Sequence, residues 1–178
     1  LAVGASPVKP PIEGVDLKNV FFLRTPEDAV ALREAAESSE VHRAVVVGGG
    51  YIGLEAAENL AARGIRTTVL EMAPQILPGF DREMAAWAED HLADAGIMAF
   101  TGERVTAITG EGKVEKVLCE NRKMKADLVV LSTGIRPNTA WLSDSGLDMV
   151  KGTLLTDFHG QTNDPAIWAV GDCAMVHN

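Results

Sequence analysis

Short apolar runs and amphipathic segments alternate through the middle of the chain. Continuous apolar runs of four or five residues predict strands that are covered on both faces of a parallel sheet. Apolar positions that recur every three or four residues predict helices between these strands. The predicted strands are 20–23, 44–48, 66–71, 97–100 and 127–132, and the predicted helices are 26–38, 52–63 and a third between Asp81 and Gly96.

The periodicity changes after residue 104. Val105–Ile108 and Val114–Leu118 flank Gly110-Glu111-Gly112 and predict a β-hairpin, to which a third arm around Met124 would add an antiparallel meander. The whole pattern predicts an α/β, Rossmann-type domain over about 20–138. We expect a four-stranded parallel sheet in the order 3-2-1-4, with the meander as a crossover on one face.

The two ends of the chain are less regular. Residues 1–19 are rich in proline and glycine and predict an extended linker, and 139–163 are irregular apart from a short β segment near Leu154-Leu155. The apolar run Ala166–Val170 predicts one more buried strand, which ends at Gly171-Asp172. We therefore divide the chain into 1–19, 20–138 and 139–178.

A glycine-rich turn follows the second predicted strand. Gly48, Gly50 and Gly53 form a G-x-G-x-x-G fingerprint between a buried strand and a helix, which is the context that dinucleotide binding requires. Gly48 permits the tight turn, Gly50 lets the backbone approach a pyrophosphate, and Gly53 lets the helix pack closely on the strand. The N-terminus of the helix would offer free N–H groups and a partial positive charge to the phosphates.

An acid at the end of the next strand refines this prediction. Glu71 follows Arg66–Leu70 and is placed to accept hydrogen bonds from the ribose hydroxyls of adenosine. It would also repel a 2′-phosphate, and Met72-Ala73-Pro74 supplies no cation. The sequence therefore predicts NAD(H) rather than NADP(H). The alternative without a dinucleotide is a βαβ unit in which Glu71 is a surface acid at the end of a strand.

Composition and charge remove several classes of function. The net charge of −9 argues against nucleic acid or an anionic membrane as a partner, and no apolar run approaches the roughly 20 residues of a membrane span. Cys119 and Cys173, like the four histidines, lack the spacing of metal ligands, so we expect no metal. Two cysteines without a disulfide framework suit a reducing, cytoplasmic location.

Four motifs occur along the chain in an order that is difficult to assign to more than one protein family. They are V-V-V-G-G-G-Y-I-G-L-E-A-A-E-N-L (45–60), V-L-E-M-A-P-Q-I-L-P (69–78), T-G-I-R-P-N-T (133–139) and T-N-D-P-A-I-W-A-V-G-D-C-A (162–174). Together they resemble the pyridine nucleotide-disulfide oxidoreductases, in particular the branch of NADH oxidases, NADH peroxidases and coenzyme A-disulfide reductases. In that family an NAD domain is inserted into an FAD domain, which implies that 1–19 and 139–178 are remnants of an FAD domain.

The resemblance implies roles for further residues. Tyr51 matches an aromatic that covers the flavin, Glu55 an acid at the nicotinamide–flavin junction, and Asp172 an acid that binds the flavin ribityl chain. Gly134 would lie near the nicotinamide half. Taken without the family, Tyr51 could equally seal the helix N-terminus, Glu55 could be a solvated acid of the first turn, and Asp172 could begin a turn. The expected cofactor-binding set is Gly48, Gly50, Tyr51, Ile52, Gly53, Glu55, Glu71, Gly134 and Asp172.

The implied parent enzyme, expected to be a homodimer, passes hydride from NADH to FAD and onward to a disulfide, peroxide or oxygen. This chain carries one dinucleotide fingerprint and no cysteine in the family's reactive position, so we expect NAD(H) binding without turnover and no catalytic residue here. Its flanks should be disordered, folded back, or paired with another copy. Two alternatives are a ferredoxin-type reductase of the same flavoproteins and a non-catalytic NAD-binding module.

Overall fold

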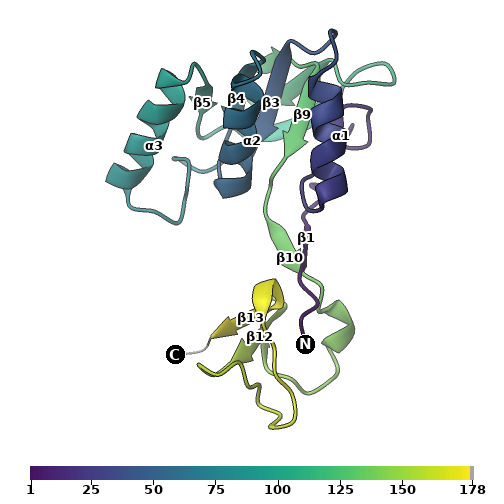
Figure 1. Cartoon of the computed structure of the whole chain (residues 1–178), viewed down its shortest axis with the longest axis vertical. Coiled ribbons are helices and arrows are strands. Elements are labelled where there is room, and N and C mark those ends of the chain that lie inside the picture. The colour runs from purple at the N-terminus through teal and green to yellow at the C-terminus, as the bar shows by residue number, and fades with distance from the viewer. Residues whose placement is uncertain (177–178) are drawn as a thin grey trace. The chain divides into compact units, whose positions relative to one another are not determined.

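A computed structural model describes residues 1–176 and divides them into two compact units (Figure 1). The larger unit is Lys9–Gly134, and the smaller one joins Leu1–Val8 to the segment that begins at Ile135. The expected linker mostly belongs to the larger unit, because Val15 is buried there and Glu13 bridges to Ala107. The unit boundaries therefore differ from the expected 19/20 and 138/139.

A five-stranded parallel sheet forms the centre of the larger unit. Its order is β2 (Val20–Phe21), β9 (Leu128–Leu131), β3 (Arg43–Val47), β4 (Arg66–Leu70) and β5 (Met98–Phe100). The expected order 3-2-1-4 is confirmed in β5-β4-β3-β9. The expected number of four strands is wrong, because β2 pairs in parallel with β9 and adds a fifth strand at that edge.

Three helices of the larger unit pack on one face of this sheet. They are α1 (Pro26–Ala36), α2 (Tyr51–Ala61) and α3 (Arg82–Asp94), and each has its predicted position within two residues at either end. Leu32, Leu60 and Leu92, one from each helix, are buried in a core with alternate residues of the central strands. α1 begins with a capping box, in which Thr25 and Asp28 exchange backbone-to-side-chain hydrogen bonds.

The predicted antiparallel meander covers the opposite face. It consists of β6 (Val105–Thr109), β7 (Lys116–Cys119) and β8 (Lys123–Lys125). Ile108 and Val117 pack against Val45 and Val47, the two valines of β3 that point away from the helices. Burial on both faces explains why β3 is continuously apolar, and the mixed α/β class is confirmed.

The smaller unit contains short strands from both flanks. β1 (Ala5–Pro7) pairs with β10 (Ile135–Pro137), and β11 (Met149–Val150), β12 (Thr153–Thr156) and β13 (Ala174–Val176) form a second sheet. Two 3₁₀ turns, η1 (Ala140–Leu142) and η2 (Gly171–Cys173), complete it. Val170 donates its N–H to the Leu1 carbonyl at 3.0 Å, so the two flanks contact each other within the smaller unit.

The prediction of a strand at Ala166–Val170 is wrong. This segment makes one isolated bridge, from Trp168 to Gln161. Ala169 is buried, but Trp168 and Val170 are about half exposed, so the apolar run does not lie inside a sheet. Among the described residues no helix is long and apolar enough to cross a membrane.

Candidate functional site

The glycine turn lies at the carboxyl end of β3, between the ends of β9 and β4. Gly48 donates its N–H to the carbonyl of Leu70 at 2.8 Å, and Ser132 donates its N–H to the carbonyl of Val47 at 2.8 Å. Gly48 has φ +108°, and a Cβ there would be 2.3 Å from the Ser132 carbonyl oxygen. Only glycine fits both the conformation and the space.

The other two fingerprint glycines differ in their surroundings. A Cβ on Gly53 would be 2.0 Å from the Gly48 carbonyl oxygen and 2.5 Å from Oγ of Ser132, so α2 packs as closely on β3 as a glycine allows. A Cβ on Gly50 would meet nothing within 4 Å. Gly50 has extended backbone and precedes the first residue of α2, which leaves an open approach to the N–H groups of the first helical turn.

Glu71 is hydrogen-bonded to the backbone of the glycine turn. Its Oε2 accepts from the N–H of Gly49 at 2.6 Å, and its Oε1 accepts from the N–H of Ala73 at 2.6 Å. Leu77 donates its N–H to the Gly49 carbonyl at 2.8 Å. Sequence reasoning missed this arrangement, because G-x-G-x-x-G and the acid are judged separately and no pattern reveals a bond between them.

Tyr51, the first residue of α2, has 66% of its surface exposed. Its ring meets that of Phe80 edge-to-face, with 5.9 Å between centroids and 71° between planes. Phe80 was not among the predicted site residues, although its position at the end of the segment after Glu71 could have suggested it.

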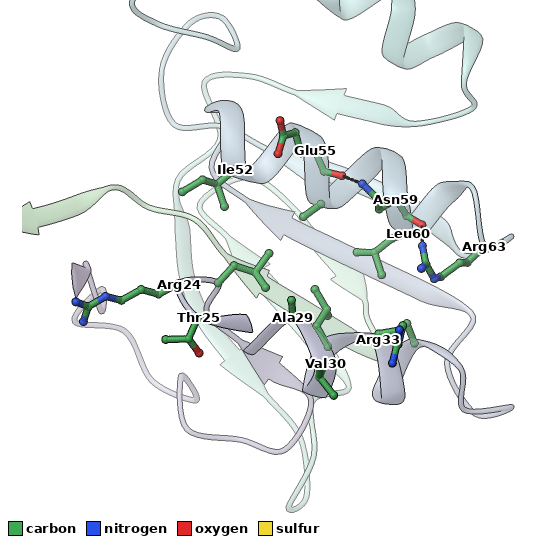
Figure 2. A pocket seen from close by; sticks show the side chains of 14 residues that line it. Arg24, Thr25, Ala29, Val30, Arg33, Ile52, Glu55, Asn59, Leu60 and Arg63 are labelled. Carbon is green, nitrogen blue, oxygen red and sulfur yellow. Dashed lines mark hydrogen bonds between the residues drawn. The ribbon is translucent and has the colours of Figure 1, made fainter. Parts of the chain in front are cut away.

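Ile52 and Glu55 lie at one end of a groove between α1 and α2 (Figure 2). The groove encloses about 580 Å³ and continues past Asn59 to Arg63 on the α2 side. Both Ile52 and Glu55 are exposed, so each is available to a ligand that reaches the start of α2. Nδ2 of Asn59 donates to the backbone carbonyl of Glu55 at 2.8 Å. This hydrogen bond does not involve the side-chain carboxylate of Glu55.

The two remaining predicted residues lie in different units. Gly134 follows β9 at the same sheet edge as the glycine turn, is exposed, and has φ +103°. Asp172 belongs to η2 of the smaller unit and is exposed. The larger unit thus contains every predicted cofactor-binding residue except Asp172.

The two described cysteines are free thiols and are not among the predicted cofactor-binding residues. Burial raises the pKa of the Cys119 thiol, and the charge of Glu103 raises it further, so Cys119 is a poor nucleophile at neutral pH. Cys173 is fully buried in the core of the smaller unit. Within residues 1–176 no three His, Cys, Asp or Glu side chains are grouped to hold a metal ion; His177 lies outside the described residues.

Comparison with known proteins shows where this arrangement occurs. The family model described as pyridine nucleotide-disulphide oxidoreductase matches residues 1–178. An NADH oxidase of Methanocaldococcus jannaschii is 41% identical over 177 residues, which are 99% of this chain and 40% of the relative. The chain thus spans less than half the length of that relative.

Two solved structures are similar over nearly the whole chain. An FAD-dependent pyridine nucleotide-disulphide oxidoreductase from Desulfovibrio vulgaris has 41% identity and a TM-score of 0.84, over 98% of this chain and 45% of that one. The covalent complex of putidaredoxin reductase with putidaredoxin has 35% identity and a TM-score of 0.90, over 100% of this chain and 44% of that one. From the match to the family model over its full length, this chain belongs to the pyridine nucleotide-disulphide oxidoreductase family.

Proposed function

We propose that this chain is the NAD(H)-binding portion of an FAD-dependent oxidoreductase that passes electrons from NADH to a disulfide, peroxide or oxygen. The observation that carries the proposal is the joined pair of Gly48–Gly53 and Glu71 at the carboxyl edge of a parallel sheet. Ligands of open α/β sheets bind outside this edge. The relatives, an NADH oxidase and an FAD-dependent reductase, support the same assignment.

The geometry of the glycine turn fits a dinucleotide. The open space at Gly50 would admit the pyrophosphate to the first N–H groups of α2, where the helix dipole favours an anion. Glu71 uses one acceptor position of each carboxylate oxygen for Gly49 and Ala73. An ionised carboxylate has about four such positions, so the others would accept the ribose hydroxyls.

Charge favours NAD(H) over NADP(H). A 2′-phosphate would approach the Glu71 carboxylate, and the next three residues, Met72-Ala73-Pro74, offer no cation to offset the repulsion. We therefore propose that binding of NADPH is weaker than binding of NADH.

For the flavin side, we propose the roles that the family resemblance implies. Tyr51 would cover the flavin, Glu55 and Gly134 would lie at the nicotinamide end, and Asp172 would bind the ribityl chain. When bound, NADH supplies a hydride and FAD accepts it. The exposed Glu55 carboxylate would orient the nicotinamide amide, and Tyr51 would exclude water from the approach.

The units receive proposed assignments in the same way. The larger unit, Lys9–Gly134, which contains most of the expected range 20–138, would form the NAD(H) domain, and the smaller unit would belong to an FAD domain. The chain carries one dinucleotide fingerprint, so we propose that it binds NAD(H) without turnover. We further propose a cytoplasmic location and a homodimeric parent enzyme, with no nucleic acid or membrane as partner.

A ferredoxin-type reductase is the second candidate. The similarity to putidaredoxin reductase favours it, since that solved structure is a covalent complex of the reductase with putidaredoxin. The two candidates share the NAD(H) site and differ in the terminal acceptor.

Titration of this chain with NADH and NADPH by isothermal calorimetry tests the proposal. We expect NADH to bind and NADPH to bind at least about tenfold more weakly, because like charges would meet at Glu71. The E71A/M72R variant should reduce or reverse the preference. Absence of NADH binding, or equal binding of both nucleotides to the wild-type chain, would refute it.

A further inference from the structure

The segment 72–80, here called the ribose loop, is hydrogen-bonded to the glycine turn and packs against it. Gly49 donates its N–H to the carboxylate of Glu71, the residue just before the loop, and its carbonyl accepts from the N–H of Leu77 within the loop. Ile76 is fully buried, and a Cβ on Gly49 would be 2.9 Å from Ile76 Cγ2, so the two segments are in close contact. Leu77 has φ +47°, a conformation that a leucine keeps only when its surroundings fix it.

The last residue of the ribose loop is held by its backbone as well. Phe80 donates its N–H to the Leu77 carbonyl at 2.8 Å, and its carbonyl accepts from Nε2 of Gln75 at 2.9 Å. Both polar groups of its peptide backbone are thus bonded within the loop. The Phe80 ring therefore has a fixed base from which to contact Tyr51.

Tyr51 has fewer constraints of its own. Two thirds of its surface is exposed, and among the described residues Phe80 supplies its aromatic neighbour. Edge-to-face pairs of this geometry shift a conformational population by about two- to tenfold. The Phe80 contact is consequently strong enough to select one position of an exposed ring.

We propose that Phe80 is a positioning residue that holds the Tyr51 ring on the ribose side of the glycine turn. The ribose loop follows β4, whereas Gly134 follows β9 on the other side of β3. A ring paired with Phe80 therefore leans away from the β9 side, where the nicotinamide would lie. This inference rests on the proposed NAD(H) site and adds that the ribose loop provides the position to which Tyr51 withdraws from the flavin that it would cover.

Because Tyr51 is the only tyrosine in the chain, its position can be observed directly. Incorporation of 3-fluorotyrosine gives a single ¹⁹F resonance. F80A should shift this resonance, and F80L, which keeps the apolar bulk without the ring, should shift it too. The matched control F158A removes an exposed phenylalanine of the smaller unit and should leave it unchanged. An unshifted resonance in both Phe80 variants would overturn the proposal.

Calorimetry with NADH and with ADP-ribose, which lacks the nicotinamide, tests the functional consequence. F80A should weaken NADH binding about two- to tenfold and leave ADP-ribose binding unchanged, because the freed ring would enter the nicotinamide path. In a Y51A background F80A should have no further effect. Equal weakening of both ligands, or an effect that persists without Tyr51, would show that Phe80 merely shapes the loop and would overturn the inference.

The two experiments also separate this inference from the proposed function. A wild-type chain that binds neither NADH nor ADP-ribose would refute the proposed NAD(H) site. The ¹⁹F shift on replacing Phe80 would still decide whether Phe80 positions Tyr51.

Discussion

The fingerprint glycines allow the folding and binding parts of the motif to be separated by two substitutions. G53A adds a methyl group 2.0 Å from the Gly48 carbonyl oxygen and 2.5 Å from Oγ of Ser132. G50A adds the same methyl group where nothing lies within 4 Å. Because the two changes are chemically identical and three residues apart, any difference between them comes from their surroundings.

The structure gives the expected size of each effect. An ordinary contact of a Cβ begins at 3.4 Å, whereas a Cβ on Gly53 would lie 2.0 Å from the Gly48 carbonyl oxygen, so G53A forces the start of α2 and the glycine turn apart by more than 1 Å. Overpacking of this kind costs about 1–3 kcal/mol, or about 2–12 °C in Tm for a chain of this size. G50A replaces a helix N-cap glycine with alanine, which costs about 0.5–1 kcal/mol. Its methyl group would, however, fill the proposed approach of the pyrophosphate and lower the affinity for NADH at least about tenfold.

Thermal unfolding followed by circular dichroism and titration with NADH measure the two quantities on the same samples. G53A should unfold at a clearly lower temperature than G50A. G50A should lose more affinity for NADH than G53A does, relative to the stability that each variant loses. If G50A bound NADH like the wild type, the assignment of Gly50 to the phosphate approach would fail. If G53A were as stable as G50A, close packing of α2 on β3 would not be what the third glycine provides.

Three further outcomes follow from named contacts. E71Q should destabilise the larger unit by about 1–3 kcal/mol in urea unfolding, because one amide cannot accept both backbone N–H groups as a carboxylate does. D127N should cost about 1–2 kcal/mol at pH 7, since Asp127 accepts a bidentate bond from Arg43. Burial alone would raise the pKa of Asp127, but its hydrogen bonds hold that pKa below 3.8; its stabilisation is therefore present above about pH 4 and lost as the pH falls through the lower folded value. Cys119, whose pKa burial raises, should react with iodoacetamide more slowly than a free thiol at pH 8.

Each of these outcomes has a matched comparison. E55Q changes an exposed acid and should leave stability unchanged within about 0.5 kcal/mol. The difference between wild type and D127N should narrow below about pH 4, and a constant difference down to pH 2 would contradict the ion-pair explanation. Glutathione provides the free-thiol rate, with C119S to subtract any labelling of Cys173. A Cys119 rate equal to that of glutathione would mean that burial does not suppress its thiolate.

The sequence predicted most of the larger unit because its strongest signals are local. Val45 and Val46 face opposite sides of the sheet and are both buried, so the apolar run itself predicts a strand in a covered parallel sheet. β2 could not be placed in the sheet, because its pairing with β9 joins residues more than 100 positions apart. Nothing within Val20–Phe21 indicates which strand it will pair with.

The failure at Ala166–Val170 has a different physical origin. Its composition is that of a buried strand, yet Trp168 and Val170 are half exposed in the smaller unit. A local pattern predicts that apolar residues prefer to be covered, but the covering surface has to be provided by other parts of a protein.

In the candidate site, the spacing of the glycines between a strand and a helix, and the position of Glu71 after the next strand, predicted that these residues lie at one edge of the sheet, where Gly49 donates a hydrogen bond to Glu71. The sequence did not predict that Phe80 meets Tyr51, because that contact depends on how the segment after Glu71 returns to the start of α2.

The bonds from Glu71 to Gly49 and Ala73 have an evolutionary consequence. A descendant of this protein that came to use NADPH would have to lose the acid that we propose repels the 2′-phosphate. That same substitution would leave two backbone N–H groups of the site without their acceptor. A second, compensating mutation would therefore be needed before or together with the first. Selection for a stable fold would thus also preserve the proposed nucleotide preference, even in a population under no selection for that preference.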